Sequence, residues 1–308
     1  MNERKGGLRV KKNILMLSIV AFFMLSACND KQSVTDIEKV DDKNTVEAVD
    51  EEVEAMDLLT EWNRIVEENV ELRDIVPFLR ETLPEATEEE ADQIVAEFER
   101  MQLDYLPHLE EKFFEDNIQE KLHEHFEGNE VEDEKVVTLL EEADESGYKV
   151  EMAEGTYFPI INYGAYRDFL PYVSNEFGDY IEIMARESDE LSAKDAAIVV
   201  TWNELVERAA NQEAFLREYP QSEKKEHVKA LYDKYVKMIL FGLDNTPLFQ
   251  YEDDRIDEEA LKQYKEVLTV LDTSETKTML QQFIELVEKS GGLLTDEIEQ
   301  FRAEMVNE

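Results

Sequence analysis

Residues 228–239 read Val-Lys-Ala-Leu-Tyr-Asp-Lys-Tyr-Val-Lys-Met-Ile and form the clearest amphipathic pattern in the chain. The apolar side chains recur at spacings of three, one, three, one and three; they are Val228, Leu231, Tyr232, Tyr235, Val236 and Ile239. These spacings place them on one face of an α-helix and leave lysine and aspartate on the other. The stretch therefore predicts a helix that packs against a hydrophobic core and is closed by Gly242.

The same helical period extends outward in both directions, from about Glu51 to the end of the chain. Thr87-Glu88-Glu89-Glu90 has the form of a capping box, which starts a helix. Ile94, Phe98, Met101 and Tyr105 follow on one face, and we expect this helix to end at Pro107. Further helices are expected at 114–127, 136–146, 164–190 with breaks at Pro171 and Gly178, 192–209 after a cap at Ser192-Ala193-Lys194-Asp195, and from Asp257, Ser274 and Thr295.

The convincing strand signal lies between Tyr148 and Ile161. Apolar residues flank Ala153-Glu154-Gly155, which is typical of a short hairpin turn. A lone hairpin is marginal in water, so we expect it to pack on the helices. The predicted fold is all-α, a helical bundle or irregular helical array with one small β-hairpin near 148–161.

The N-terminal segment indicates export. Five basic residues precede an apolar run from Ile14 to Ala27, which is shorter than the roughly 20 residues that a membrane-spanning helix needs. Leu25-Ser26-Ala27-Cys28 follows, and this order resembles the signal peptide and lipobox of a bacterial lipoprotein. The resemblance implies that Cys28 carries a diacylglycerol and that the protein is anchored by lipid to the cell membrane, facing outside the cytoplasm.

We expect four regions along the chain. Residues 1–27 are interpreted as the signal peptide and 28–50, which are polar and acidic, as a disordered tether. Residues 51–147 form an N-terminal helical region. Residues 148–308 form the hairpin and a further helical region, and the two regions are either separate or one continuous domain.

The charge balance excludes one class of partner. The chain carries 75 acidic and 32 basic residues, for a net charge of −43. Nucleic acid is not expected as a ligand because phosphate binding requires clustered lysine and arginine. Adaptation of an exposed protein to high salt or alkaline surroundings explains the acidity, and cation binding or repulsion from an anionic wall are the alternatives. Cys28 is the single cysteine, so no disulfide is expected.

Aromatic residues gather between Tyr157 and Tyr180. Two interpretations apply to Tyr163, Tyr166 and Tyr172: they pack the hairpin onto the helices, or they line a groove for a sugar or peptide. Pro171 separates Tyr172 from the other two. We therefore expect Tyr163 and Tyr166 in the core and Tyr172 to be more exposed.

Motifs for metal binding and catalysis are weak or absent. His123 and His125 are two residues apart, which directs them to different sides of a helix rather than to one metal. The acidic residues of 253–259 lack the ligand spacing of a calcium-binding EF-hand loop and suit a helix N-terminus better. The nucleophile, P-loop and dinucleotide motifs are missing from the sequence. We expect no metal and no cofactor, and no catalytic residue is assigned.

Two partial resemblances concern the exported region. Phe215-Leu216-Arg217-Glu218-Tyr219-Pro220-Gln221-Ser222 looks like the turn between the helices of a tetratricopeptide-like repeat, although no second copy follows. The segment 158–251 looks similar to lipoproteins of Gram-positive, spore-forming bacteria, a family that implies no particular activity.

These observations favour a membrane-anchored protein that binds or scaffolds a protein or a cell-wall glycan at the membrane–wall interface. A carboxylate-based cell-wall hydrolase and a solute-binding lipoprotein of a transporter remain as alternatives. The hydrolase would require two converging carboxylates, one of them desolvated, and the transporter component would require large α/β lobes.

Replacing Cys28 tests the anchor. We expect Cys28→Ala to release the protein from the membrane fraction or to leave the signal peptide uncut, because lipid supplies the membrane affinity. Metabolic labelling with a fatty acid should mark the wild-type protein and not the variant. Labelling of both proteins, or of neither, would contradict the lipobox interpretation.

Overall fold

The computed structural model describes residues 58–68, 70–128 and 133–306. The predicted signal peptide at 1–27, Cys28 and the predicted tether at 28–50 lie outside the described residues. The residues from Glu54 to Glu308 group into one compact unit by their contacts. Within the described ranges, no helix is both long and apolar enough to cross a membrane.

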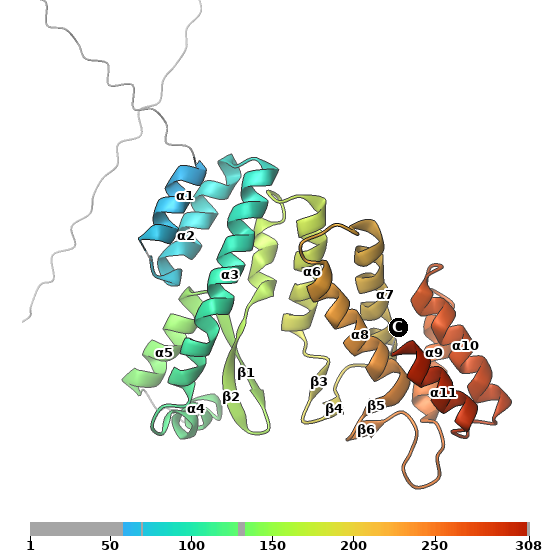
Figure 1. Ribbon diagram of the computed structural model, residues 1–308. Coiled ribbons are helices and arrows are strands. Elements are labelled where there is room, and N and C mark those ends of the chain that lie inside the picture. The colour runs from blue at the N-terminus through green and yellow to red at the C-terminus, as the bar shows by residue number, and fades with distance from the viewer. Residues whose placement is uncertain (1–57, 69, 129–132, 307–308) are drawn as a thin grey trace, which may run out of the picture. The chain divides into compact units, whose positions relative to one another are not determined.

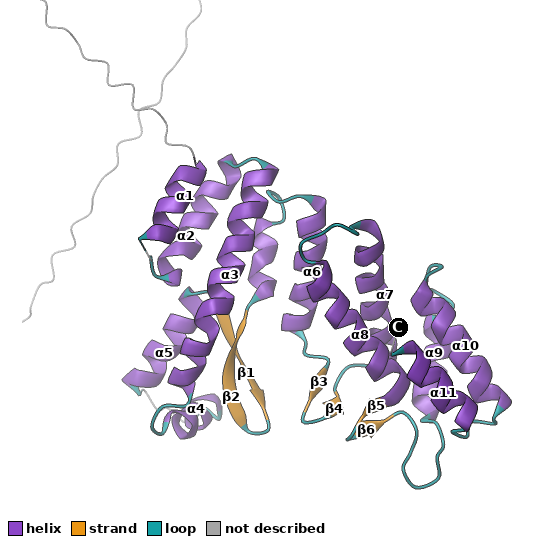
Figure 2. Ribbon diagram, viewed as in Figure 1, coloured by secondary structure: helices purple, strands orange, loops and turns teal. Residues whose placement is uncertain are grey.

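Helices make up most of this unit, and the strands form small antiparallel pairs (Figures 1 and 2). In chain order the helices are α1 (Leu58–Glu67), α2 (Leu72–Thr82), the 3-10 helix η1 (Leu83–Glu85), α3 (Glu88–Phe113), α4 (Ile118–Phe126), α5 (Glu134–Glu145), the 3-10 helix η2 (Tyr163–Phe169), α6 (Asn175–Asp189), α7 (Trp202–Glu218), α8 (Lys225–Phe241), α9 (Glu258–Val267), α10 (Glu275–Lys289) and α11 (Asp296–Met305). The paired strands are β1 (Tyr148–Ala153) with β2 (Thr156–Ile161), β3 (Ala193–Lys194) with β4 (Ala197–Ile198), and β5 (Gly242–Leu243) with β6 (Thr246–Pro247). The all-α class with a hairpin near 148–161 is confirmed.

Helix α3 is the centre of the first hydrophobic cluster. The capping box at its start is present: the Glu90 backbone N–H donates to Thr87 Oγ1 at 3.3 Å, and the Thr87 N–H donates to Glu90 Oε2 at 2.8 Å. The buried face of α3 includes Ile94, Phe98 and Phe113. Helices α1, α4 and α5 and strand β2 all contact α3, so this one helix positions the surrounding elements.

Two expected helix breaks do not occur. Pro107 lies inside α3, which continues to Phe113. The proline removes the N–H that would bond to the carbonyl of Leu103, but Leu103 is 47% exposed, so water can satisfy that carbonyl. Gly178 lies inside α6, where the nearest atom to an added Cβ would be a Leu170 side-chain carbon at 3.5 Å. The helix therefore accommodates both residues.

A second cluster joins α7 to α11. It contains buried residues of α7, α8, α9, α10 and α11, among them Trp202, Tyr235, Tyr264 and Phe283. The Tyr264 hydroxyl donates to the carbonyl oxygen of Ile239 at 2.7 Å, which ties α9 to α8. The amphipathic helix expected at 228–239 is confirmed as the central part of α8.

The expected helix cap at Ser192–Asp195 is wrong. Ala193–Lys194 is strand β3, and α7 begins only at Trp202, where Thr201 Oγ1 accepts from the Glu204 N–H at 3.2 Å. Asp195 and Ala196 have φ values of +53° and +56°, which fit the two-residue turn of a hairpin. The short strands β3–β6 carry too few residues to show a period of two, so the sequence pattern did not reveal them.

The three hairpins are hydrogen-bonded to one another at their tips (Figure 2). The Glu154 N–H of the first hairpin donates to Asp195 Oδ1 of the second at 2.6 Å. Asn245 Nδ2 of the third donates to the carbonyl oxygen of Asp195 at 2.6 Å. Each tip therefore supports the next, and the turns form a continuous row.

Two glycines with positive φ test how far the hairpins depend on backbone space. Gly242 has φ +74°, and a Cβ there would overlap the Thr246 carbonyl oxygen and lie 2.6 Å from Leu248 N. Gly155 has φ +70° with nothing within 4 Å. We expect Gly155→Ala to cost about 1–2 kcal/mol of unfolding free energy through the left-handed backbone alone. Gly242→Ala should lose a further ~1–3 kcal/mol through the clash.

Urea unfolding of the two variants and the wild type measures both losses. Equal losses at the two positions would contradict the described packing of β5 against β6.

Candidate functional site

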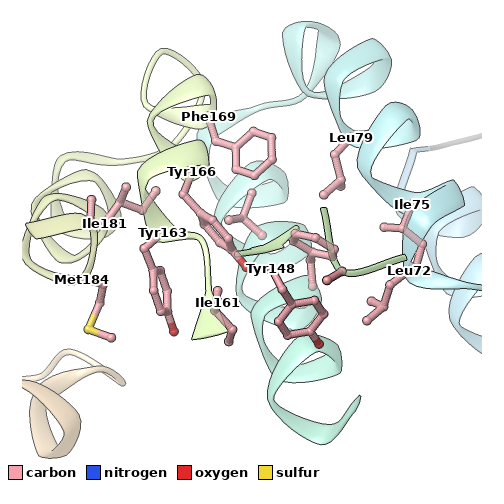
Figure 3. Packing of buried hydrophobic residues seen from close by; sticks show 14 of the residues in the cluster. Leu72, Ile75, Leu79, Tyr148, Ile161, Tyr163, Tyr166, Phe169, Ile181 and Met184 are labelled. Atoms are coloured by element: carbon pink, nitrogen blue, oxygen red, sulfur yellow. The ribbon is translucent and has the colours of Figure 1, made fainter. Parts of the chain in front are cut away.

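The aromatic residues singled out in the sequence divide as expected. Tyr163 and Tyr166 lie in η2 and are 6% and 2% exposed, whereas Tyr172 is only partly buried. Figure 3 shows both buried rings inside the first cluster, between Ile181 and Met184 on one side and Tyr148 and Ile161 on the other. Their burial fits the packing interpretation. A ligand groove involving the three tyrosines stays a prediction.

The two buried tyrosines bond to polar groups of α3. The Tyr163 hydroxyl donates to Glu99 Oε1 at 2.6 Å, and the Tyr166 hydroxyl donates to Gln102 Oε1 at 2.5 Å. Burial, with the neighbouring Glu99 charge, raises the pKa of Tyr163 well above its usual range, so the hydroxyl remains a donor. The Tyr180 hydroxyl also donates to Glu99 Oε1, and Lys224 forms an ion pair with Glu99 Oε2. This network has partners for its polar groups, which indicates a structural role.

A cavity of about 570 Å³ lies between α6 and α7, within the size range of small-molecule sites. The two helices run in opposite directions: the Tyr219 hydroxyl after α7 donates to Asp179 Oδ2 at the start of α6, and Arg208 pairs with Glu187 near the end of α6. The lining residues of α6 lie on one face, at Asp179, Glu182, Ile183, Arg186 and Glu187. Those of α7 are Arg208, Asn211, Gln212, Ala214, Phe215, Arg217 and Glu218, and η2 adds Arg167. We call this cavity the α6–α7 groove.

Arg208 forms the inner end of the groove, with its side chain 1% exposed. Its Nε donates to Glu204 Oε1 at 2.7 Å, and its Nη1 donates to the carbonyl oxygen of Glu190 at 2.8 Å. Burial disfavours the charged guanidinium, but the hydrogen bond to Glu204 and the nearby Tyr235 and Glu187 outweigh that effect and raise the pKa of Arg208. The group is therefore a permanent cation.

Two buried polar atoms of groove residues have no hydrogen-bond partner among the described residues. They are Arg208 Nη2 and Gln212 Oε1, one helical turn apart on α7. The nearest carboxylate oxygen listed for Arg208 Nη2 is Glu190 Oε2, an ion-pair contact at 3.6 Å, which is too long for a hydrogen bond. A buried donor or acceptor left unpaired costs about 1–3 kcal/mol, so such atoms usually have a partner. A donor and an acceptor at the wall of a cavity are suited to binding a ligand.

The other arginines of the groove are held by carboxylates. Arg186 donates to both oxygens of Glu204 at 2.7 and 2.6 Å, and the first of these oxygens also bonds Arg208. Burial favours the neutral acid, but the hydrogen bonds from Arg186 and Arg208 outweigh it and lower the pKa of Glu204. Arg167 contacts Glu182 at 3.0 Å and Asp189 at 2.6 Å. The walls of the groove are therefore rigidly cross-linked by charge.

Carboxylates outnumber arginines around the groove. Four arginines and four carboxylates line it. Further carboxylates pair with these arginines from outside the lining, namely Asp189, Glu190, Glu204, Glu207 and Glu213. The electrostatic potential in the groove is therefore negative, which favours a ligand that carries positive charge.

The histidines and acidic clusters do not gather around a metal. In the ranges 58–68, 70–128 and 133–306, no group of three or more His, Cys, Asp or Glu residues is placed to hold a metal ion. His123 Nε2 instead bonds to the carbonyl oxygen of Gly155 at 2.9 Å, and Asp257 accepts from the Ala260 N–H at 2.8 Å as the N-cap of α9.

The groove residues were missed in the sequence. Arg208 and Gln212 belong to no motif, and the groove exists only because α6 and α7 pack together. A signal was present, however: Leu205, Ala209 and Gln212 share the buried face of α7, so an amide interrupts an apolar stripe. A polar residue on a core face needs a partner, and that requirement was the available clue.

Comparisons with known proteins add no further information. A scan against protein-family models, a search of the curated proteins and a search of the solved structures each found no match to this chain. The argument about function therefore depends on the groove and on the sequence.

Alanine substitutions separate the buried tyrosines from Tyr172. We expect Tyr163→Ala and Tyr166→Ala each to lower the free energy of unfolding by about 3–5 kcal/mol, because each removes a large buried ring. Tyr172→Ala should cost about 1 kcal/mol, as is usual for a partly exposed site. Denaturant unfolding measures these losses, and a larger loss for Tyr172→Ala than for the other two would contradict the described packing.

Proposed function

We propose that this chain is a lipid-anchored extracytoplasmic binding protein that takes a polar ligand into the α6–α7 groove. The anchor is a diacylglycerol on Cys28, and the flexible segment 28–50 holds the helical unit away from the membrane. One observation carries the binding role: Arg208 Nη2 and Gln212 Oε1 are buried, lack hydrogen-bond partners and belong to residues that line a cavity. A ligand that supplies both partners would remove the cost of leaving them unpaired.

A hydrolase finds less support in the charge state of the carboxylates. A general acid of that kind requires a carboxyl group with a raised pKa. The pKa shifts resolved for carboxyl groups among the described residues are downward, at Glu90, Asp133, Glu142, Glu204 and Glu259. A transporter component with large α/β lobes is likewise a poor fit to a helical unit.

Photo-crosslinking from the groove tests the binding role. Asn211 lines the groove and is exposed, so a photoreactive p-benzoylphenylalanine at this position should tolerate the replacement and reach the ligand. Irradiation of cells that carry the full chain should give a discrete mass increment on the protein, measured by intact-mass spectrometry.

The matched control places the same photoreactive residue at Gln300, which is exposed on α11 away from the groove lining. No increment is expected there. Absence of an increment at Asn211, or the same increment at both positions, would refute ligand binding in the α6–α7 groove.

A further inference from the structure

We infer that the ligand of the α6–α7 groove is an extended peptide segment with positive charge. This inference rests on the proposed function, because it assigns a ligand class to the same site. It combines the two unpartnered atoms, the surplus of carboxylates and the length of the groove.

The unpartnered atoms require a donor and an acceptor together. Arg208 Nη2 is a donor and Gln212 Oε1 is an acceptor, and positions four apart on a helix are neighbours on its surface. A peptide backbone carries both groups: a carbonyl can accept from Arg208, and an N–H can donate to Gln212. A polyamine offers donors alone and would leave Arg208 Nη2 unpaired. Amide groups therefore match the groove better than a simple cation does.

A sugar is a weaker match because the groove lacks an aromatic platform. Phe215 is the aromatic residue among those that line it, and it is 3% exposed. Its ring packs against Tyr180 and Tyr219, with centroid distances of 6.5 and 5.1 Å. Its face is therefore engaged within the protein rather than available for stacking.

Charge selects among peptides. The carboxylates around the groove exceed the arginines, so a negatively charged peptide would be repelled and a lysine-containing one attracted. At the outer end, Arg217 has its side chain 62% exposed and only a 4.0 Å contact with Glu213. Glu218 beside it is exposed as well. These two neighbours should act on a cationic ligand with opposite signs.

The groove accommodates a short extended segment. It follows α7 from Arg208 to Glu218, a distance of about 15 Å at the helical rise. An extended chain spans at most about 3.3–3.6 Å per residue, so about four residues fill that length.

Three probes separate the ligand classes by isothermal titration calorimetry with the full helical unit at low ionic strength. They are acetyl-Ala-Lys-Ala-Lys-amide, acetyl-Ala-Glu-Ala-Glu-amide and spermine, a cation without amides. We expect the lysine peptide to bind about tenfold more tightly than the glutamate peptide. We also expect it to bind more tightly than spermine.

Gln212→Leu tests the hydrogen bond to the peptide. It should weaken binding of the lysine peptide by about tenfold, the value of a neutral hydrogen bond. The melting temperature should stay unchanged or rise, since the substitution removes a buried atom that has no partner. The control Gln102→Leu should lower the melting temperature, because Gln102 bonds to Ser146 and Tyr166.

The outer charges give a test of sign. Arg217→Gln should tighten binding of the lysine peptide and Glu218→Gln should weaken it, each by about two- to fivefold for exposed charges. Arg255→Gln, with its side chain 58% exposed and outside the groove lining, should leave the affinity unchanged.

Equal affinities for the two peptides would overturn the inference, as would spermine binding as tightly as the lysine peptide. Binding of the lysine peptide that is unaffected by Gln212→Leu would overturn it too. If no probe binds but the Asn211 crosslink persists, the peptide class is wrong and the binding role stands. If the crosslink is also absent, the proposed function fails together with the ligand class.

Discussion

The buried carboxylate of Glu99 determines how the helices around α3 are arranged. Glu99 is 2% exposed, and moving an ion out of water costs several kcal/mol unless good partners surround it. The hydroxyl groups of Tyr163 and Tyr180 and the ammonium group of Lys224 supply those partners. They come from η2, α6 and the residue before α8, so satisfying one charge fixes three elements against α3. The position of α6 in turn sets one wall of the groove.

The acidity of the chain gives its few cations particular value. With 75 acidic and 32 basic residues, most carboxylates have no cation of their own. The arginines of the groove nevertheless have several carboxylate partners each, as Arg186 with Glu204 and Glu207 illustrates. Arg208 is surrounded in the same way. Charge is therefore concentrated in the one place where α6 and α7 face a cavity, which holds the walls in place without a metal or a disulfide among the described residues.

Local patterns in the sequence were sufficient for the helices and insufficient for the groove. The capping box at Thr87 and the N-caps Asp257, Ser274 and Thr295 involve side chains and backbone groups within one turn, so the sequence alone revealed them. Pro107 was misjudged because its cost depends on the exposure of a carbonyl one turn earlier, which tertiary structure decides. The groove requires Arg208 and Gln212 to lie opposite α6, and no periodicity within α7 specifies that neighbour.

The ion pair between Lys224 and Glu99 joins residues 125 positions apart, whereas the most extensive contacts join elements that are close in the chain. Short-range packing of this kind lets helices and hairpins form early and locally. Glu99, however, lacks its cation until α8 is in place. A fragment that ends before Lys224 would carry an uncompensated charge in its core. The two hydrophobic clusters are for this reason one cooperative unit in unfolding, and neither half is an independently stable module.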